Sequence, residues 1–182
     1  MTKNPLIQAY KKPAVFISLP SGGKWYDPKP NLSVDNEIAV YPMSAKDELI
    51  TKTPDALFNG EATVSLLESC VPDIENPRQI PVSDLLVLMI AIRQASYGSK
   101  LDVDLTCPEC KMLNQLAIDS GRLLSSSKEV DSEDSVKLEN GFKITVKPYN
   151  LEDRTLLQLQ SIKQQKMLRD LENDALNDEE RQ

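Results

Sequence analysis

The sequence holds one pattern with recognisable metal or redox chemistry, the pair Cys107 and Cys110 with Pro108 and Glu109 between them. Two thiolates at this spacing between strands form half of a zinc ribbon, whereas a structural zinc site normally takes four ligands. The chain has no histidine, and Cys70 is its only further thiol. Three interpretations stay open: a turn without metal, which is favoured and implies no cofactor; a zinc site, conceivably with Cys70 and Glu109; and a redox dithiol.

The absence of histidine also bears on catalysis. It removes a Ser–His–Asp triad, a Cys–His pair and the commonest general base. The run Ser21-Gly22-Gly23-Lys24 lacks the full spacing of a phosphate-binding loop and is expected to form only a turn. Asp47 and Glu48 fall in the first turn of an expected helix, where they complement its dipole. We therefore expect no enzyme and no small-molecule substrate.

The charge composition of the chain restricts the classes of partner that it is expected to bind. The 182 residues carry 28 acidic and 21 basic side chains, for a net charge of −7. An acidic chain without a basic block repels phosphate backbones and anionic lipid, so neither a nucleic acid nor a membrane is expected as partner. The longest apolar run, from residue 85 to 92, is far too short to span a membrane. Without a recognisable leader, the three cysteines are typical of reduced thiols in a cytosol.

The elements around the two cysteines are expected to be β-strands. Residues 101–105 alternate strictly between apolar and acidic, which is the period of a half-exposed strand, and 113–118 form the return strand. A Ser-rich, charged stretch at 125–134 predicts a flexible loop. Asn140-Gly141 between 136–139 and 142–146 is a strong hairpin signal.

The part before the cysteines is expected to contain short strands and then a helical core. Ser44 is expected to cap a helix, Thr53 a short helix at 54–57, and Asn59-Gly60 to separate that helix from the next. Ser83 and Asp84 are expected to start the helix at the centre of the core, buried on most sides and ending near Gly98. The expected strands are 15–19 and 37–41, the helices of this core are 61–69 and 83–96, and a proline-rich connector covers 71–81.

Two side-chain features of this part have alternative interpretations. Trp25 and Tyr26 either cap the core beside the glycine turn, which is favoured, or form an exposed patch for a partner. Arg93, near the end of the core helix, is expected to hydrogen-bond helix-terminal carbonyls if it lies inside.

The last expected helix runs from Leu151 to about Leu171, followed by an acidic tail, 172–182, that frays. Its apolar side is expected to pack on the chain's own core, with a partner's groove as the alternative. The fold class is therefore α+β: a central helical block with N-terminal short strands, a zinc-ribbon-like β-knuckle and β-hairpin, and a C-terminal helix. The expected divisions are 1–99, 100–149 and 150–182. The residues on the apolar side are Leu156, Leu159, Ile162, Met167 and Leu171.

Four segments in order carry a family resemblance: FISLPSGGKWY, VYPMSAKDELITKTPDALFNGEA, SCVPDI and AIRQASYGSKLDVDLTCPEC. Together they resemble the baseplate hub subunit family of T4-like tailed bacteriophages, over about Phe16 to Ile118. The resemblance implies a part in assembling the central hub of a contractile-tail baseplate, either as a virion component or as an assembly factor (chaperone).

The resemblance also implies partners and places. The partners would be other baseplate hub or tail proteins, met in the host cytoplasm during assembly and, for a virion component, in the tail baseplate of the virion. No catalytic residue is carried over. The motif residues expected either to determine the fold or to contact partners are Trp25, Tyr26, Asp47, Glu48, Asp55 and Asn59. The competing hypothesis is a small zinc-binding or redox interaction module that uses Cys107 and Cys110.

Overall fold

The computed structural model describes residues 12–52, 60–130 and 135–179. It combines helices with short antiparallel strand pairs, which confirms the α+β class. The expected helix at 54–57 lies outside the described residues, as do Asp55 and Asn59.

A two-stranded sheet forms one side of the core. Strand β1 (Val15–Ser18) pairs antiparallel with β2 (Glu37–Val40), and Val15 lies opposite Val40. Both strands are one residue shorter than expected at their C-terminal ends. Ile17 lies opposite Ile38 and both are buried, because side chains paired directly across a sheet point to the same face.

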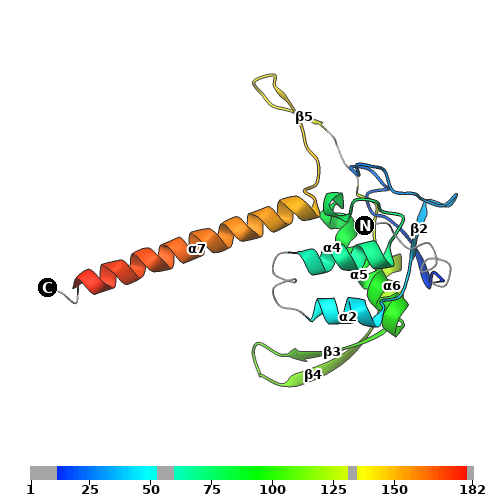
Figure 1. The fold of residues 1–182 in the computed structure, drawn as a ribbon, viewed down its shortest axis with the longest axis horizontal. Coiled ribbons are helices and arrows are strands. Elements are labelled where there is room, and N and C mark those ends of the chain that lie inside the picture. The colour runs from blue at the N-terminus through cyan, green and yellow to red at the C-terminus, as the bar shows by residue number, and fades with distance from the viewer. Residues whose placement is uncertain (1–11, 53–59, 131–134, 180–182) are drawn as a thin grey trace.

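Three helices and a short 3-10 turn complete the core. They are α2 (Ala45–Thr51), α4 (Glu61–Cys70), η1 (Pro77–Gln79) and α5 (Val82–Tyr97). Helix α5 packs against both strands of the sheet, and α4 packs against α2 (Figure 1). The core is aliphatic, and its largest fully buried side chains include Ile38, Leu67, Ile74, Ile80, Leu85, Leu88 and Ile92.

Helix α5 differs from the expectation at its start. It begins at Val82, after Pro81, and no side chain caps it. It is buried or half-buried on most sides, as expected, and only Leu86 and Tyr97 are exposed along it. Its end at Tyr97, directly before Gly98, agrees with the prediction.

The cysteines lie at the tip of a two-stranded ribbon. Strand β3 (Lys100–Thr106) pairs antiparallel with β4 (Leu113–Asp119), in the register that places Thr106 opposite Leu113. The two strands are those predicted, each longer by one or two residues. Side chains in the outer half of the ribbon are almost all exposed.

Helix α6 (Ser120–Ser125) follows the ribbon and was not predicted, because Ser and Gly are poor helix formers. Its start is capped by Asp119, whose side chain accepts a 2.8 Å hydrogen bond from the Gly121 N–H. Ser120 is buried and donates from Oγ to Gln94 Oε1 at 2.8 Å, which ties the helix to α5. Of the expected flexible loop, residues 131–134 lie outside the described residues.

The predicted Asn-Gly hairpin is present. Strand β5 (Ser135–Lys137) pairs antiparallel with β6 (Lys143–Thr145), and the turn closes through a 2.9 Å bond from Gly141 N–H to the Leu138 carbonyl. Gly141 has φ 85°, a conformation that favours glycine.

Helix α7 (Leu151–Glu179) overturns two expectations. It continues to Glu179 instead of ending near Leu171. It also projects away from the helical body instead of packing on it (Figure 1). Most of its large apolar side chains beyond the first turn are therefore exposed instead of covered by the core.

Candidate functional site

The base of α7 is held by a reciprocal cap. Asn150 Oδ1 accepts from the Asp153 N–H at 2.8 Å, and Asp153 Oδ2 accepts from the Asn150 N–H at 3.2 Å. Asn150 Nδ2 also donates to Gln79 Oε1 at 3.0 Å, and Gln79 Nε2 donates to Glu152 Oε2 at 3.2 Å. These hydrogen bonds hold the start of α7 against η1 and so fix the direction in which α7 extends from the core.

Backbone and apolar contacts support the same joint. The Leu151 N–H donates to the Ile80 carbonyl at 2.9 Å, and the Val82 N–H donates to the Tyr149 carbonyl at 3.1 Å. The Leu151 side chain is only 5% exposed. The first turn of α7 is therefore part of the core.

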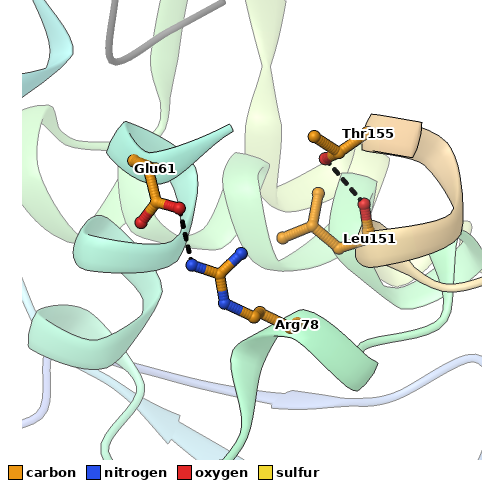
Figure 2. A network of polar contacts seen from close by, with 4 residues as sticks. All are labelled: Glu61, Arg78, Leu151 and Thr155. Atoms are coloured by element: carbon orange, nitrogen blue, oxygen red, sulfur yellow. Dashed lines mark hydrogen bonds and ion pairs between the residues drawn. The ribbon is translucent and has the colours of Figure 1, made fainter. Parts of the chain in front are cut away.

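Figure 2 shows the joint beside the start of α4. Arg78 donates to Glu61 Oε1 at 2.6 Å, so η1 is paired with α4, and Thr155 Oγ1 donates to the Leu151 carbonyl at 2.9 Å. Gly60 has φ 77°, and a Cβ there would lie 2.9 Å from Thr155 Oγ1. Helices α4 and α7 thus meet at a position where only glycine fits without a shift.

Beyond this joint, α7 exposes large apolar side chains. We call the five whose side chains are 56% to 67% exposed the outer leucine set: Leu156, Leu157, Met167, Leu168 and Leu171. Exposed apolar side chains in such number mark a contact surface on a folded protein. A hollow along the helix, lined by Ile162, Gln165, Lys166, Arg169 and Asp170, has α7 as its only wall and cannot enclose a small ligand.

A buried carboxylate, which the sequence did not single out as a site, joins the glycine turn to α5. Asp84 is fully buried; its Oδ1 accepts from the Ser21 N–H at 2.8 Å and its Oδ2 from Tyr26 OH at 2.7 Å. Ser21 Oγ makes a further short hydrogen bond to Oδ2. The pKa of Tyr26 is raised strongly, first by burial and then by the negative charge of Asp84. Tyr26 is therefore placed in the core, whereas Trp25 is half-buried with φ 62°.

Asp47 and Glu48 lie in the first turn of α2 but make different contacts. Asp47 is buried and forms a capping box with Ser44, whose capping role was predicted, and its Oδ2 also accepts from Ser69 Oγ at 2.9 Å. Glu48 is half-buried, and its Oε1 accepts from Tyr97 OH at 2.9 Å. Asp47 therefore holds α2 on α4, while Glu48 reaches the end of α5.

Arg93 performs the role predicted for it. Its guanidinium donates to the carbonyls of Gly98 at 2.6 Å and Lys100 at 2.9 Å, and it lies 5.8 Å from the ring centre of Tyr97. The side chain thereby fastens the end of α5 to the start of β3 and orients the ribbon.

The cysteine knuckle closes the ribbon with a tight turn. The Cys107 N–H donates to the Met112 carbonyl at 2.9 Å, the Lys111 N–H donates to the Cys107 carbonyl at 3.0 Å, and Lys111 has φ 58°. The pKa of Cys107 is lowered by hydrogen bonds from the backbone N–H groups of Cys110 and Glu109 and from the Cys110 thiol.

The structure brings Cys107 and Cys110 together but does not bring Cys70 to them. Cys70 is fully buried in the core at the end of α4, whereas Cys110 is exposed. Within residues 12–52, 60–130 and 135–179, no three Cys, Asp or Glu side chains are grouped as metal ligands.

Comparison with known protein families assigns residues 13–177 to the family described as T4 bacteriophage base plate protein. The chain belongs to this family. The assignment confirms the resemblance found from residues 16 to 118 and extends it over the hairpin and nearly all of α7. No match was found among curated proteins or among solved structures. In the described part of this base plate protein, no helix is long and apolar enough to cross a membrane.

Proposed function

We propose that this base plate protein is a component or an assembly factor of the baseplate hub, and that it acts through contacts with other hub or tail proteins rather than by catalysis. Its family membership supports the class of structure it serves. The single structural observation that carries the contact role is the projecting helix α7 with its outer leucine set.

The geometry of α7 explains why a partner is needed. A helix of 29 residues is about 44 Å long, and only its base is packed into the core. Helices gain most of their stability from packing an apolar face against another surface, so a long unpacked helix adds little to the stability of a monomer. Contact with a hub or tail protein would cover the outer leucine set.

The rigid base of α7 gives the contact a defined direction. Capping by Asn150, the Gln79 bonds and the burial of Leu151 fix the first turn on the body. A partner that binds the outer part of the helix would therefore be held at a set distance and orientation from the core. Such positioning is what a hub component or an assembly factor requires.

Deleting the gene from the parent phage tests the proposal. We expect tails that are absent or non-infectious, with normal assembly restored when the intact protein is supplied from a plasmid, as judged by titre and electron microscopy of lysates. Normal infectious tails from the deletion phage would overturn the proposal. Mass spectrometry of purified virions then separates the two forms of it, because only a virion component persists in the finished particle.

A further inference from the structure

The cysteine knuckle is built as half of a tetrahedral metal site. Its two thiol-bearing residues lie on one tight turn, closed by the backbone bonds between Cys107 and the Lys111–Met112 segment. The positive φ of Lys111 lets the chain turn back within these few residues. This arrangement presents two sulfur atoms together, as the Cys-x-x-Cys half of a structural zinc site does.

The chain cannot supply two more sulfur or nitrogen ligands to the knuckle. It contains three cysteines and no histidine in all. The third cysteine, Cys70, is fully buried in the helical core and belongs to its hydrophobic cluster. A closed structural site of four Cys or His ligands therefore requires ligands from another molecule.

The tip of the ribbon is accessible to a second copy of itself. From Asp104 to Ala117 every side chain is exposed except that of Cys107, which is partly exposed. Met112 and Leu113, directly beside the knuckle, are 65% and 62% exposed. Two such tips related by a two-fold axis would bring four cysteines around one point and cover these apolar side chains at the same time.

We propose that Cys107 and Cys110 bind a zinc ion jointly with the same two cysteines of a second copy, so that one zinc site made of four cysteines clips two ribbons together. Four thiolates around Zn²⁺ carry a net charge of −2, and the charges that Glu109 and Lys111 of each copy add beside the site cancel. The two ribbons then form a dimer contact that leaves α7 free for hub or tail proteins.

The test measures zinc content and molecular mass on the full chain. The protein is purified under reducing conditions, stripped with a chelator and titrated with zinc chloride, and its mass is followed by light scattering. We expect about one zinc ion per two chains and a doubling of mass that a chelator reverses. Cobalt substituted for zinc should give the intense visible and thiolate charge-transfer bands of a tetrahedral all-sulfur site.

Cysteine variants distinguish zinc binding by the knuckle from zinc binding by Cys70. Cys107→Ser and Cys110→Ser, at an exposed turn that the core does not depend on, should fold as the wild type does by circular dichroism and lose both zinc binding and dimerisation. Cys70→Ala is the matched control and should keep both.

Four results would overturn the proposal. They are no zinc bound, one zinc per chain at monomeric mass, zinc retained by Cys107→Ser, and a dimer that persists without metal. Each leaves the hub proposal standing, because that proposal rests on α7.

Discussion

Asp84 is the residue on which the N-terminal turn depends. Its carboxylate is fully buried, yet it lies in the first turn of α5, where the helix dipole favours a negative charge, and it accepts hydrogen bonds from Ser21 and Tyr26. A buried charge is tolerated only when such partners satisfy it. The bonds tie the Ser-Gly-Gly turn to the central helix across 63 residues of sequence.

Replacing Asp84 by Ala should therefore destabilise the fold. The change leaves the donors of Ser21 and Tyr26 buried without an acceptor, and we expect the free energy of unfolding in urea to fall by about 2–4 kcal/mol. The matched control is Asp102→Ala on the ribbon, an exposed acid 3.6 Å from Lys100, which should change the free energy by less than about 0.5 kcal/mol. Equal effects of the two substitutions would contradict the role given to Asp84.

The raised pKa of Tyr26 leads us to predict that the protein loses stability at alkaline pH. Its pKa in the folded chain is raised above the value of about 10 in an unfolded chain, so the folded state keeps its proton where the unfolded state releases it. The resulting stabilisation is fully present below about pH 10 and falls as the pH rises further. We expect a smaller fall of the unfolding free energy with pH, above about pH 10, in Tyr26→Phe than in the wild type. If Tyr26→Phe kept the wild-type slope, the burial account would be wrong.

At the scale of elements, the sequence alone was enough to predict those features that depend on residues adjacent in the chain. The Ser44 cap with Asp47, the Asn-Gly hairpin and the glycine at the end of α5 were all predicted, because caps and turns depend on a few adjacent residues. The packing of α7 was predicted wrongly, because an apolar side does not say which surface covers it. Helix α6 was missed, since Asp119 and the buried Ser120 stabilise it through contacts that propensity does not contain.

The candidate sites also divide into those set by residues close in sequence, which could be predicted, and those set by distant contacts, which could not. The pairing of Cys107 with Cys110 at a strand-to-strand turn followed from spacing and alternation alone. The bonds of Asp84 to Ser21 and Tyr26 did not, because they join segments distant in sequence. The one available signal was Asp84 itself, an acid in the first turn of a largely apolar helix. Its favourable interaction with the helix dipole was already a sufficient reason for an acid at that position, so no further role was inferred.

Gly60 tests the close approach of α4 and α7. Gly60→Ala brings both an unfavourable positive φ and a Cβ only 2.9 Å from Thr155 Oγ1, whereas Gly141→Ala brings an unfavourable φ, 85°, with nothing within 4 Å. We expect Gly141→Ala to lower the free energy of unfolding by about 1 kcal/mol and Gly60→Ala to lower it by about 1–2 kcal/mol more. Thermal and urea unfolding measure the difference, and an equal loss in both variants would show that the joint is looser than described.

Alanine substitutions at Leu151 and Leu168 compare how much the base and the outer part of α7 contribute to stability. Leu151→Ala removes a side chain that is 5% exposed and should cost about 2–4 kcal/mol of unfolding free energy. Leu168→Ala removes one that is 60% exposed and should change it by less than about 0.5 kcal/mol in the isolated protein. Urea unfolding of the two variants decides this, and a large loss from Leu168→Ala would mean that the outer helix packs on the chain itself.

At the scale of the whole molecule, two elements extend from a small α+β core. One is α7 with the outer leucine set, and the other is the β3–β4 ribbon with the knuckle at its tip (Figure 1). The core residues explain how these elements are oriented: Asn150 and Gln79 for α7, and Arg93 for the ribbon. This form agrees with the proposed role of contacting hub or tail proteins.

The central claim, that α7 acts by binding hub or tail proteins, is tested most directly by plasmid complementation of a phage that lacks this gene. Leu157→Gln with Leu168→Gln removes two exposed apolar side chains and keeps helix propensity, and Lys163→Gln is the control on the same helix. We predict that the wild type and the control restore the titre and complete baseplates, while the double variant, with unchanged unfolding free energy, does not. Full restoration by the double variant would contradict the account.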